Sequence, residues 1–270
     1  MFLINRALTG LFDLLLAPFD RLPAVLGLAI LALGTAIAVL LVFKWTSDQP
    51  RLTAAKRAMQ AAVFEMRLFN DDLVLLFRAQ GGVLRHTATY LRHSFAPTLW
   101  LLVPMMALLL HMEFRFGYSG LTVGHTALLK ARLTTADAPV TLEAPAGIDV
   151  ETDAVHFPSR REVVWRIRPR SPGSYELRVD AGGARSTKTV EVSDGVARRS
   201  PVRPGSHFIE QLLNPSEPPL PDATGLADIT VEYPDRPFTV AGWNIGWSGV
   251  YLLLTLVFAF LLKGLFGVTI

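Results

Sequence analysis

Residues 96–110 read APTLWLLVPMMALLL and contain no charged side chain. Continued to Phe114, this apolar run is long enough for a helix that crosses the roughly 30 Å hydrocarbon core of a bilayer. Pro97 and Pro104 each remove a backbone donor and weaken the helix hydrogen bonds around them. We therefore expect residues 96–116 to form a membrane span.

The segment before this span, residues 46–95, has the pattern of a helical hairpin. Its apolar side chains recur at spacings of three and four, as in the seam of a coiled coil. They are Leu52, Ala55, Met59, Ala62, Met66, Phe69, Leu73 and Leu76. Asn70-Asp71-Asp72 favours a turn, and Gln80-Gly81-Gly82 favours a second break. We expect two antiparallel helices that continue into the span.

Composition places the chain among membrane proteins, since 51% of its 270 residues are hydrophobic and only 18% are charged. Three apolar runs have the length of a span: residues 24–45, 97–114 and 247–268. The chain has no cysteine, which excludes disulfides and thiol chemistry. Its net charge of +3 suits membrane topology or anionic lipid, so we expect no DNA partner, and no motif predicts a metal or cofactor.

Residues 1–22 have the pattern of an amphipathic helix in the external membrane interface. Its polar stripe comprises Arg6, Thr9, Asp13 and Asp20, and its apolar stripe Phe2, Leu8, Leu11, Phe12, Leu15 and Phe19. A signal peptide is the competing interpretation, but acids within the apolar stretch and the lack of a small-residue cleavage site disfavour it.

The first span, residues 23–45, has Thr35 as the only polar side chain in its middle. Gly27 and Gly34 lie two turns apart, where another helix could approach closely. Cations are more numerous after this span, at Lys44, Arg51, Lys56 and Arg57, than before it, at Arg6 and Arg21. By the positive-inside rule, the hairpin is cytoplasmic, the N-terminus lies outside and the C-terminus inside a bacterial or archaeal inner membrane.

Several side chains are expected at the outer membrane interface. His111, Glu113 and Arg115 end the second span and are expected to snorkel toward water rather than form a buried site. Trp243, Trp247 and Tyr251 precede or begin the third span, residues 245–270.

From Gly117 the hydrophobic period changes to two, which indicates short strands. We predict strands at residues 127–133, 140–143, 148–152, 162–168, 174–179, 188–192 and 228–233. Trp165 and Ile167 alternate inward with Arg166 and Arg168 outward. Residues 117–244 are thus predicted to form an external immunoglobulin-like β-sandwich. The fold class is membrane α plus all-β.

The proline-rich stretch 198–221 interrupts the strands and leaves room for a short helix at residues 206–213. Arg166, Arg168 and Arg178 are either a binding patch on one sheet face or its solvent side.

Taken together, residues 1–116 and 245–270 resemble the YidC/Oxa-type insertase superfamily, in particular its reduced three-span branch of archaeal YidC-like proteins and the insertase subunit of the endoplasmic-reticulum membrane protein complex. The resemblance rests on the order of elements and on Phe95-Ala96-Pro97 and Val103-Pro104-Met105, seven residues apart. It implies a hydrophilic groove, open to the cytoplasm, along which short polar segments of nascent membrane proteins cross. The family's groove usually includes a positive residue in the first span; this sequence has none in the middle of its first span, where Thr35 is the only polar side chain, and Lys44 lies at the edge.

The candidate groove residues are Thr35, Lys44, Arg51, Arg92, Pro97 and Pro104. The resulting hypothesis is an insertase or assembly factor, not an enzyme, whose hairpin receives a nascent membrane protein or a ribosome. The alternative is a non-catalytic membrane scaffold or receptor whose external sandwich binds a protein partner.

This topology can be tested with single cysteines, because the native chain has none. Cysteines at Ser94 and Ser193 should react with an impermeant thiol reagent from opposite sides of the membrane. Reaction of both from the same side would contradict the predicted orientation.

Overall fold

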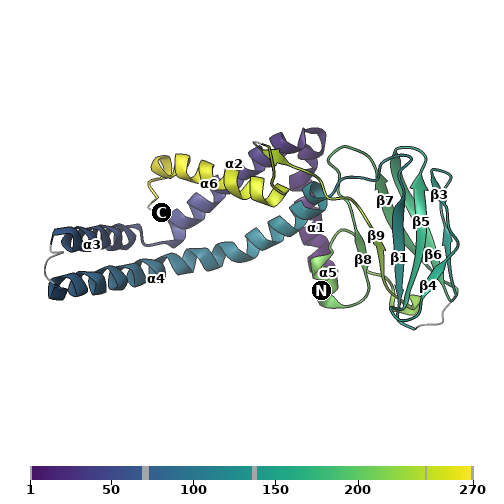
Figure 1. Cartoon of the computed structure of the whole chain (residues 1–270), viewed down its shortest axis with the longest axis horizontal. Coiled ribbons are helices and arrows are strands. Elements are labelled where there is room, and N and C mark those ends of the chain that lie inside the picture. The colour runs from purple at the N-terminus through teal and green to yellow at the C-terminus, as the bar shows by residue number, and fades with distance from the viewer. Residues whose placement is uncertain (1, 69–72, 136–138, 241, 269–270) are drawn as a thin grey trace. The chain divides into compact units, whose positions relative to one another are not determined.

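The computed structural model describes residues 2–68, 73–135, 139–240 and 242–268 (Figure 1). Its main helices are α1 (Phe2–Leu16), α2 (Ala24–Thr46), α3 (Gln49–Leu68), α4 (Leu73–Met112), α5 (Phe208–Leu213) and α6 (Trp247–Phe266). Short helical turns η1 (Ala17–Arg21), η2 (Glu113–Gly117) and η3 (Asp222–Thr224) complete the helical part. Among the described residues, three helical segments are long and apolar enough to cross a membrane: Ala24–Thr46, Thr98–Gly117 and Trp247–Phe266. The chain thus has the features of a membrane protein.

The chain divides into two compact units. The first, here the β unit, comprises Met1–Leu28 and Leu108–Val250, and the second, the span unit, comprises Ala29–Ala107 and Tyr251–Ile270.

In the span unit, α2 buries one face rather than its whole circumference. Leu31, Ala32, Thr35, Ala36 and Leu40 are buried, and their spacing follows the helical period. The Tyr251 hydroxyl of α6 donates a hydrogen bond to Thr35 Oγ1 at 2.8 Å. This bond satisfies two polar groups that would otherwise be costly in an apolar setting.

The hairpin helices α3 and α4 contact one another in antiparallel order. The Thr87 hydroxyl donates to Met59 Sδ at 3.3 Å, and a Cβ added at Gly82 would lie 3.5 Å from the Ala62 side chain. The expected turn at residues 70–72 lies outside the described residues, and the coiled-coil geometry stays a prediction.

The predicted break at Gln80-Gly81-Gly82 is wrong, because α4 is a continuous helix of 40 residues through this point. Each glycine costs about 1 kcal/mol relative to alanine, which packing can offset. Gly82 lies close to α3, where a larger side chain would have to be accommodated.

The β unit contains two main antiparallel sheets. One has the order β3-β5-β1-β9-β8, with β4 also paired to β5, and the other has the order β2-β6-β7. The strands are β1 (Ala127–Leu133), β2 (Val140–Glu143), β3 (Ile148–Val150), β4 (Val155–Phe157), β5 (Glu162–Pro169), β6 (Gly173–Ala181), β7 (Ala184–Val192), β8 (Val202–Pro204) and β9 (Leu226–Val231). A separate hairpin pairs β10 (Thr239–Val240) with β11 (Trp243–Asn244).

Buried residues from both sheets form one hydrophobic core. Trp165 and Ile167 of β5 are buried in it, as are Leu177 and Val179 of β6, while Tyr175 packs at its border. The predicted inward alternation is confirmed at Trp165 and Ile167. Strands β4, β8, β10 and β11 were not predicted, since each has only two or three residues and too few alternations to show a period.

The three arginines that could have shared a sheet face do not. Arg166 and Arg168 lie on β5, whereas Arg178 lies on β6 in the other sheet. Arg168 instead pairs with Glu151 at 2.7 Å.

We expect Trp165→Ala to lower the free energy of unfolding of the β unit by about 3–5 kcal/mol, because it leaves a cavity where a large aromatic ring was buried. Urea unfolding of residues 118–236, followed by circular dichroism, measures this loss. Phe157→Ala is the matched control, since this aromatic side chain is 44% exposed, and should cost less than about 1 kcal/mol. Equal losses in the two variants would show that Trp165 is not a core residue.

Candidate functional site

Four charged side chains gather where α1 meets the end of the second candidate span. They are Asp13 of α1, Asp20 of η1, Arg115 of η2 and Arg198 of the segment between β7 and β8, and we call them the charge cluster. All four belong to the β unit.

Arg115 is at the centre of the charge cluster. Its side chain is only 5% exposed, and its two terminal nitrogens contact the carboxylates of Asp13, at 3.1 Å, and Asp20. The expectation that Arg115 snorkels toward water is therefore wrong. Its charge is neutralised in place, which is how buried guanidinium groups are tolerated.

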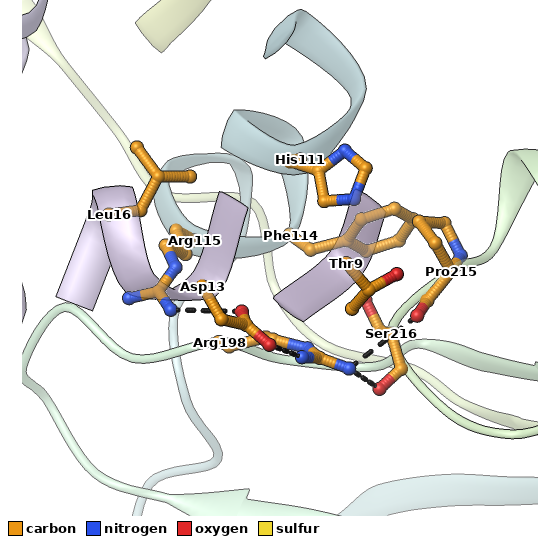
Figure 2. Close-up of a pocket in the computed structure, with 9 residues that line it drawn as sticks. All are labelled: Thr9, Asp13, Leu16, His111, Phe114, Arg115, Arg198, Pro215 and Ser216. Atoms are coloured by element: carbon orange, nitrogen blue, oxygen red, sulfur yellow. Dashed lines mark hydrogen bonds and ion pairs between the residues drawn. The ribbon is translucent and has the colours of Figure 1, made fainter. Parts of the chain in front are cut away.

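Arg198 joins the second oxygen of Asp13 to the proline-rich stretch. Its guanidinium donates to Asp13 Oδ2 and to the carbonyl of Ser216 (Figure 2). Asp13 thus receives hydrogen bonds from two arginines that come from different parts of the chain.

The neighbouring residue, Arg199, fixes the backbone that presents Arg198. Its N–H donates to the carbonyl of Phe114 at 2.7 Å, and its guanidinium donates to the carbonyls of Tyr118, Ser193 and Gly195 at 3.0, 2.9 and 2.8 Å. Burial, together with the charge of Arg236, lowers the pKa of Arg199 to about 10. The hydrogen bonds that the Arg199 guanidinium donates go mainly to main-chain carbonyls.

Glu217 fixes the other partner of Arg198, because it directly follows Ser216. Its carboxylate accepts from Lys188 Nζ at 2.5 Å, the Thr189 N–H at 2.7 Å and the Ser200 hydroxyl at 2.8 Å. Burial acts to raise the pKa of Glu217, but the charge of Lys188 and these hydrogen bonds outweigh it and hold the pKa below its usual range. Burial lowers the pKa of Lys188.

The cavity beside the charge cluster is small. Its volume is about 10 Å³, and it is lined by Thr9, Asp13, Leu16, His111, Phe114, Arg115, Arg198, Pro215 and Ser216 (Figure 2). This is room for one water molecule at most. Two carboxylates and two guanidiniums also balance in charge, so the arrangement fastens α1 to the β unit rather than binding a substrate.

Two further contacts strengthen this junction. The rings of Phe12 and His111 stack with their centroids 4.3 Å apart. The Trp247 indole N–H, at the start of α6, donates to Glu113 Oε2 at 2.8 Å. Trp247 is buried, so this predicted interface residue also has a packing role.

The predicted groove residues differ in burial and in their contacts. Thr35 is buried and bonded to Tyr251, whereas Lys44, Arg51, Arg92 and Pro104 are exposed. Arg51 pairs with Asp48 at 2.9 Å. The side chain of Pro97 lies outside those described. Thr35 and Lys44 are nine residues apart on one helix, about 13 Å along its axis, so they do not meet. Their role as a groove lining stays a prediction.

The charge cluster was missed in the sequence, although part of its signal was present. Isolated acids in an apolar helix, such as Asp13 and Asp20, and a lone cation at the end of a span, such as Arg115, are costly unless they pair. Because each of these charges is costly alone, pairing the opposite charges would have predicted the contacts of Arg115 with Asp13 and Asp20. Nothing in the local sequence distinguishes Arg198 from Arg199.

We expect Arg115→Met to lower the free energy of unfolding by about 2–4 kcal/mol, since it leaves Asp20 without its guanidinium partner. The value is below that for a fully enclosed pair because both carboxylates are about one-third exposed. Thermal unfolding of the full chain in detergent measures it. Adding Asp20→Asn should recover part of the loss.

The matched control is Arg51→Met, which breaks an ion pair whose arginine side chain is 70% exposed and should cost less than about 1 kcal/mol. Similar losses for the Arg51 and Arg115 variants would contradict a central role for Arg115.

Among the described residues, no group of three or more histidines, cysteines, aspartates or glutamates is placed to hold a metal ion. Comparison with known proteins found no family model, no curated protein and no solved structure that matches this chain.

Proposed function

We propose that the chain is a membrane-protein insertase or assembly factor of the YidC/Oxa type, in the cytoplasmic membrane of a bacterium or archaeon. The observation that carries the proposal is the continuity of α4. It is one helix of 40 residues, about 60 Å long, that runs from the basic hairpin into the second candidate span. A client segment bound at the hairpin is thereby delivered to the membrane by the same element.

The loose packing of the candidate spans supports this function. Only 39, 22 and 17% of the residues in their apolar windows are buried within the protein. The remaining apolar side chains, such as Trp100, Val103 and Leu261, are available to lipid or to a client helix moving along them.

Charge at the cytoplasmic end supplies the attraction for a client. Lys44 and Arg92 are exposed, and α2 has no charged residue before Lys44. An acidic client segment would be drawn to this entrance. The hairpin is a coiled coil in this proposal, and the β unit is an immunoglobulin-like sandwich, supported by its two antiparallel sheets and the core around Trp165.

A scaffold or receptor is the second candidate function. It is favoured by an open cavity of about 460 Å³ beside β1 and the end of β9, lined in part by Thr122, His125, Glu232 and Tyr233. Its volume lies in the range of small-ligand and peptide sites, about 300–1,000 Å³.

The two candidates differ in how they respond to charge reversal. We expect Lys44→Glu combined with Arg92→Glu to slow insertion of a client with a short acidic tail at least fivefold, because unit charges near contact interact by about 1 kcal/mol in water. Insertion of the same client with a neutral tail should change little. Protease protection of each client in reconstituted liposomes measures both rates.

The control variant combines Arg67→Glu with Arg78→Glu, two exposed cations near the far end of the hairpin. It should leave the preference for the acidic tail intact. If the wild-type chain inserts neither client faster than empty liposomes do, the insertase proposal is wrong and the scaffold remains.

A further inference from the structure

The apolar side chains of helix α5 are exposed on the surface of the β unit. It has six residues, and Phe208, Ile209, Leu212 and Leu213 are 55, 68, 46 and 54% exposed. At about 100° per residue, these four side chains occupy one continuous arc of the helix. A helix on the surface of a soluble domain normally has the reverse orientation, so this face requires an apolar environment.

The polar side of α5 holds it to the β unit. Glu210 lies 3.6 Å from Arg132 of β1, and the Gln211 amide donates to the carbonyl of Ser206 at 2.8 Å. At the end of α5, the Asn214 side chain donates to the carbonyl of Glu210 at 3.0 Å. Of these contacts, the one between Glu210 and Arg132 joins α5 to a strand, on the side opposite the apolar face.

The charge cluster connects the segment after α5 to the ends of two candidate spans. Asp20 lies four residues before α2, and Arg115 lies two residues before the end of the second candidate span. Asp13 connects through Arg198 to Ser216, three residues beyond α5. Thr9 and Asp13 of α1 line the same small cavity as Pro215 and Ser216, which follow α5. Three contacts thus connect the end of the second candidate span to the segment after α5: Arg115 with Asp13, Asp13 with Arg198, and Arg198 with Ser216.

Helix α1 has the same unusual exposure. Leu11, Leu14 and Leu15 are 57, 77 and 50% exposed, while Asp13 and Leu16 face the β unit. Both helices therefore present exposed apolar side chains, and the charge cluster connects α1 to the segment that follows α5. An interfacial bilayer surface accommodates both, since such helices bury one apolar face among the acyl chains and keep polar groups in water.

Cations surround α5 on its polar side. A cavity of about 440 Å³ separates it from the turn before β5, and Arg132, Arg160, Arg161 and His207 line this cavity together with Glu210. Arg160 and Arg161 are exposed, and Arg161 donates to the carbonyl of Thr134 at 3.2 Å. Cations next to an inserted apolar face are the complement of anionic phospholipid headgroups.

We propose that α5 is a second interfacial helix, whose apolar face inserts into the bilayer leaflet on which α1 lies and whose neighbouring arginines bind anionic lipid headgroups. The β unit is then attached to the membrane surface at α5 in addition to its chain connections.

Site-specific labels in the full chain test this proposal. An environment-sensitive fluorophore is attached to Leu212→Cys, or to Ile209→Cys as a second position, and the protein is reconstituted into vesicles that contain a lipid-borne quencher. The control is Val150→Cys on β3, which is 38% exposed in the native chain and lies at the opposite edge of the sheet from β8. Four strand spacings, about 19 Å, separate these edges.

The labels at Leu212 and Ile209 should be quenched several-fold more strongly than the label at Val150. Equal quenching at all three positions would overturn the proposal. So would a label at Leu212 with apolar emission but no lipid quenching, since this would mean that a protein partner or a second copy covers α5.

Headgroup binding is tested by comparing vesicles of phosphatidylcholine with vesicles that also contain phosphatidylglycerol. Anionic lipid should increase the ratio of inserted to free label, and Arg160→Gln should reduce that increase by about fivefold. A ratio that does not respond to phosphatidylglycerol would overturn the assignment of the arginines to headgroups.

Discussion

The positive charge of Arg115 can be buried only beside carboxylates, and this requirement determines how α1 packs within the β unit. A guanidinium at the end of an apolar span cannot lose its proton to escape the cost of desolvation. Asp13 and Asp20 meet that cost, and in doing so they fix α1 against η2. The orientation of α1, with Leu11, Leu14 and Leu15 outward, follows from which of its sides carries the acids.

Buried polar contacts also connect the charge cluster to the rest of the β unit. Arg198 can reach Asp13 only because Arg199 holds the adjacent backbone through several carbonyls, and Ser216 is in place because Glu217 is bound to Lys188. Gly120 permits this packing, since a Cβ there would collide with the backbone of Ser193. Irregular segments between β7 and β9 are therefore held by buried polar contacts where no regular backbone pairing is available.

Local patterns in the sequence predicted most of the helices and strands. They could not predict contacts between residues that are far apart in the chain. The boundaries of β1 and β2 and the inward alternation of Trp165 and Ile167 follow from a period of two, which is visible within a few residues. The break expected at Gly81 failed because the propensity of glycine is a weak local preference, and the contact of Gly82 with α3 is not local. Arg115 was misassigned for the same reason, since its partners lie about 100 residues away.

These separations set an order in time for the assembly of the chain. Asp20 and Asp13 precede Arg115 by 95 and 102 residues, and Asp13 precedes Arg198 by 185 residues. At a synthesis rate of about 5–20 residues per second, the last of these partners is made roughly 10–40 s after Asp13. Until Arg115 is made, roughly 5–20 s after Asp13, neither guanidinium of the charge cluster is available to hold α1. Docking of the first helix is therefore among the last events in the biogenesis of this chain, and it reports that the β unit has reached its folded state.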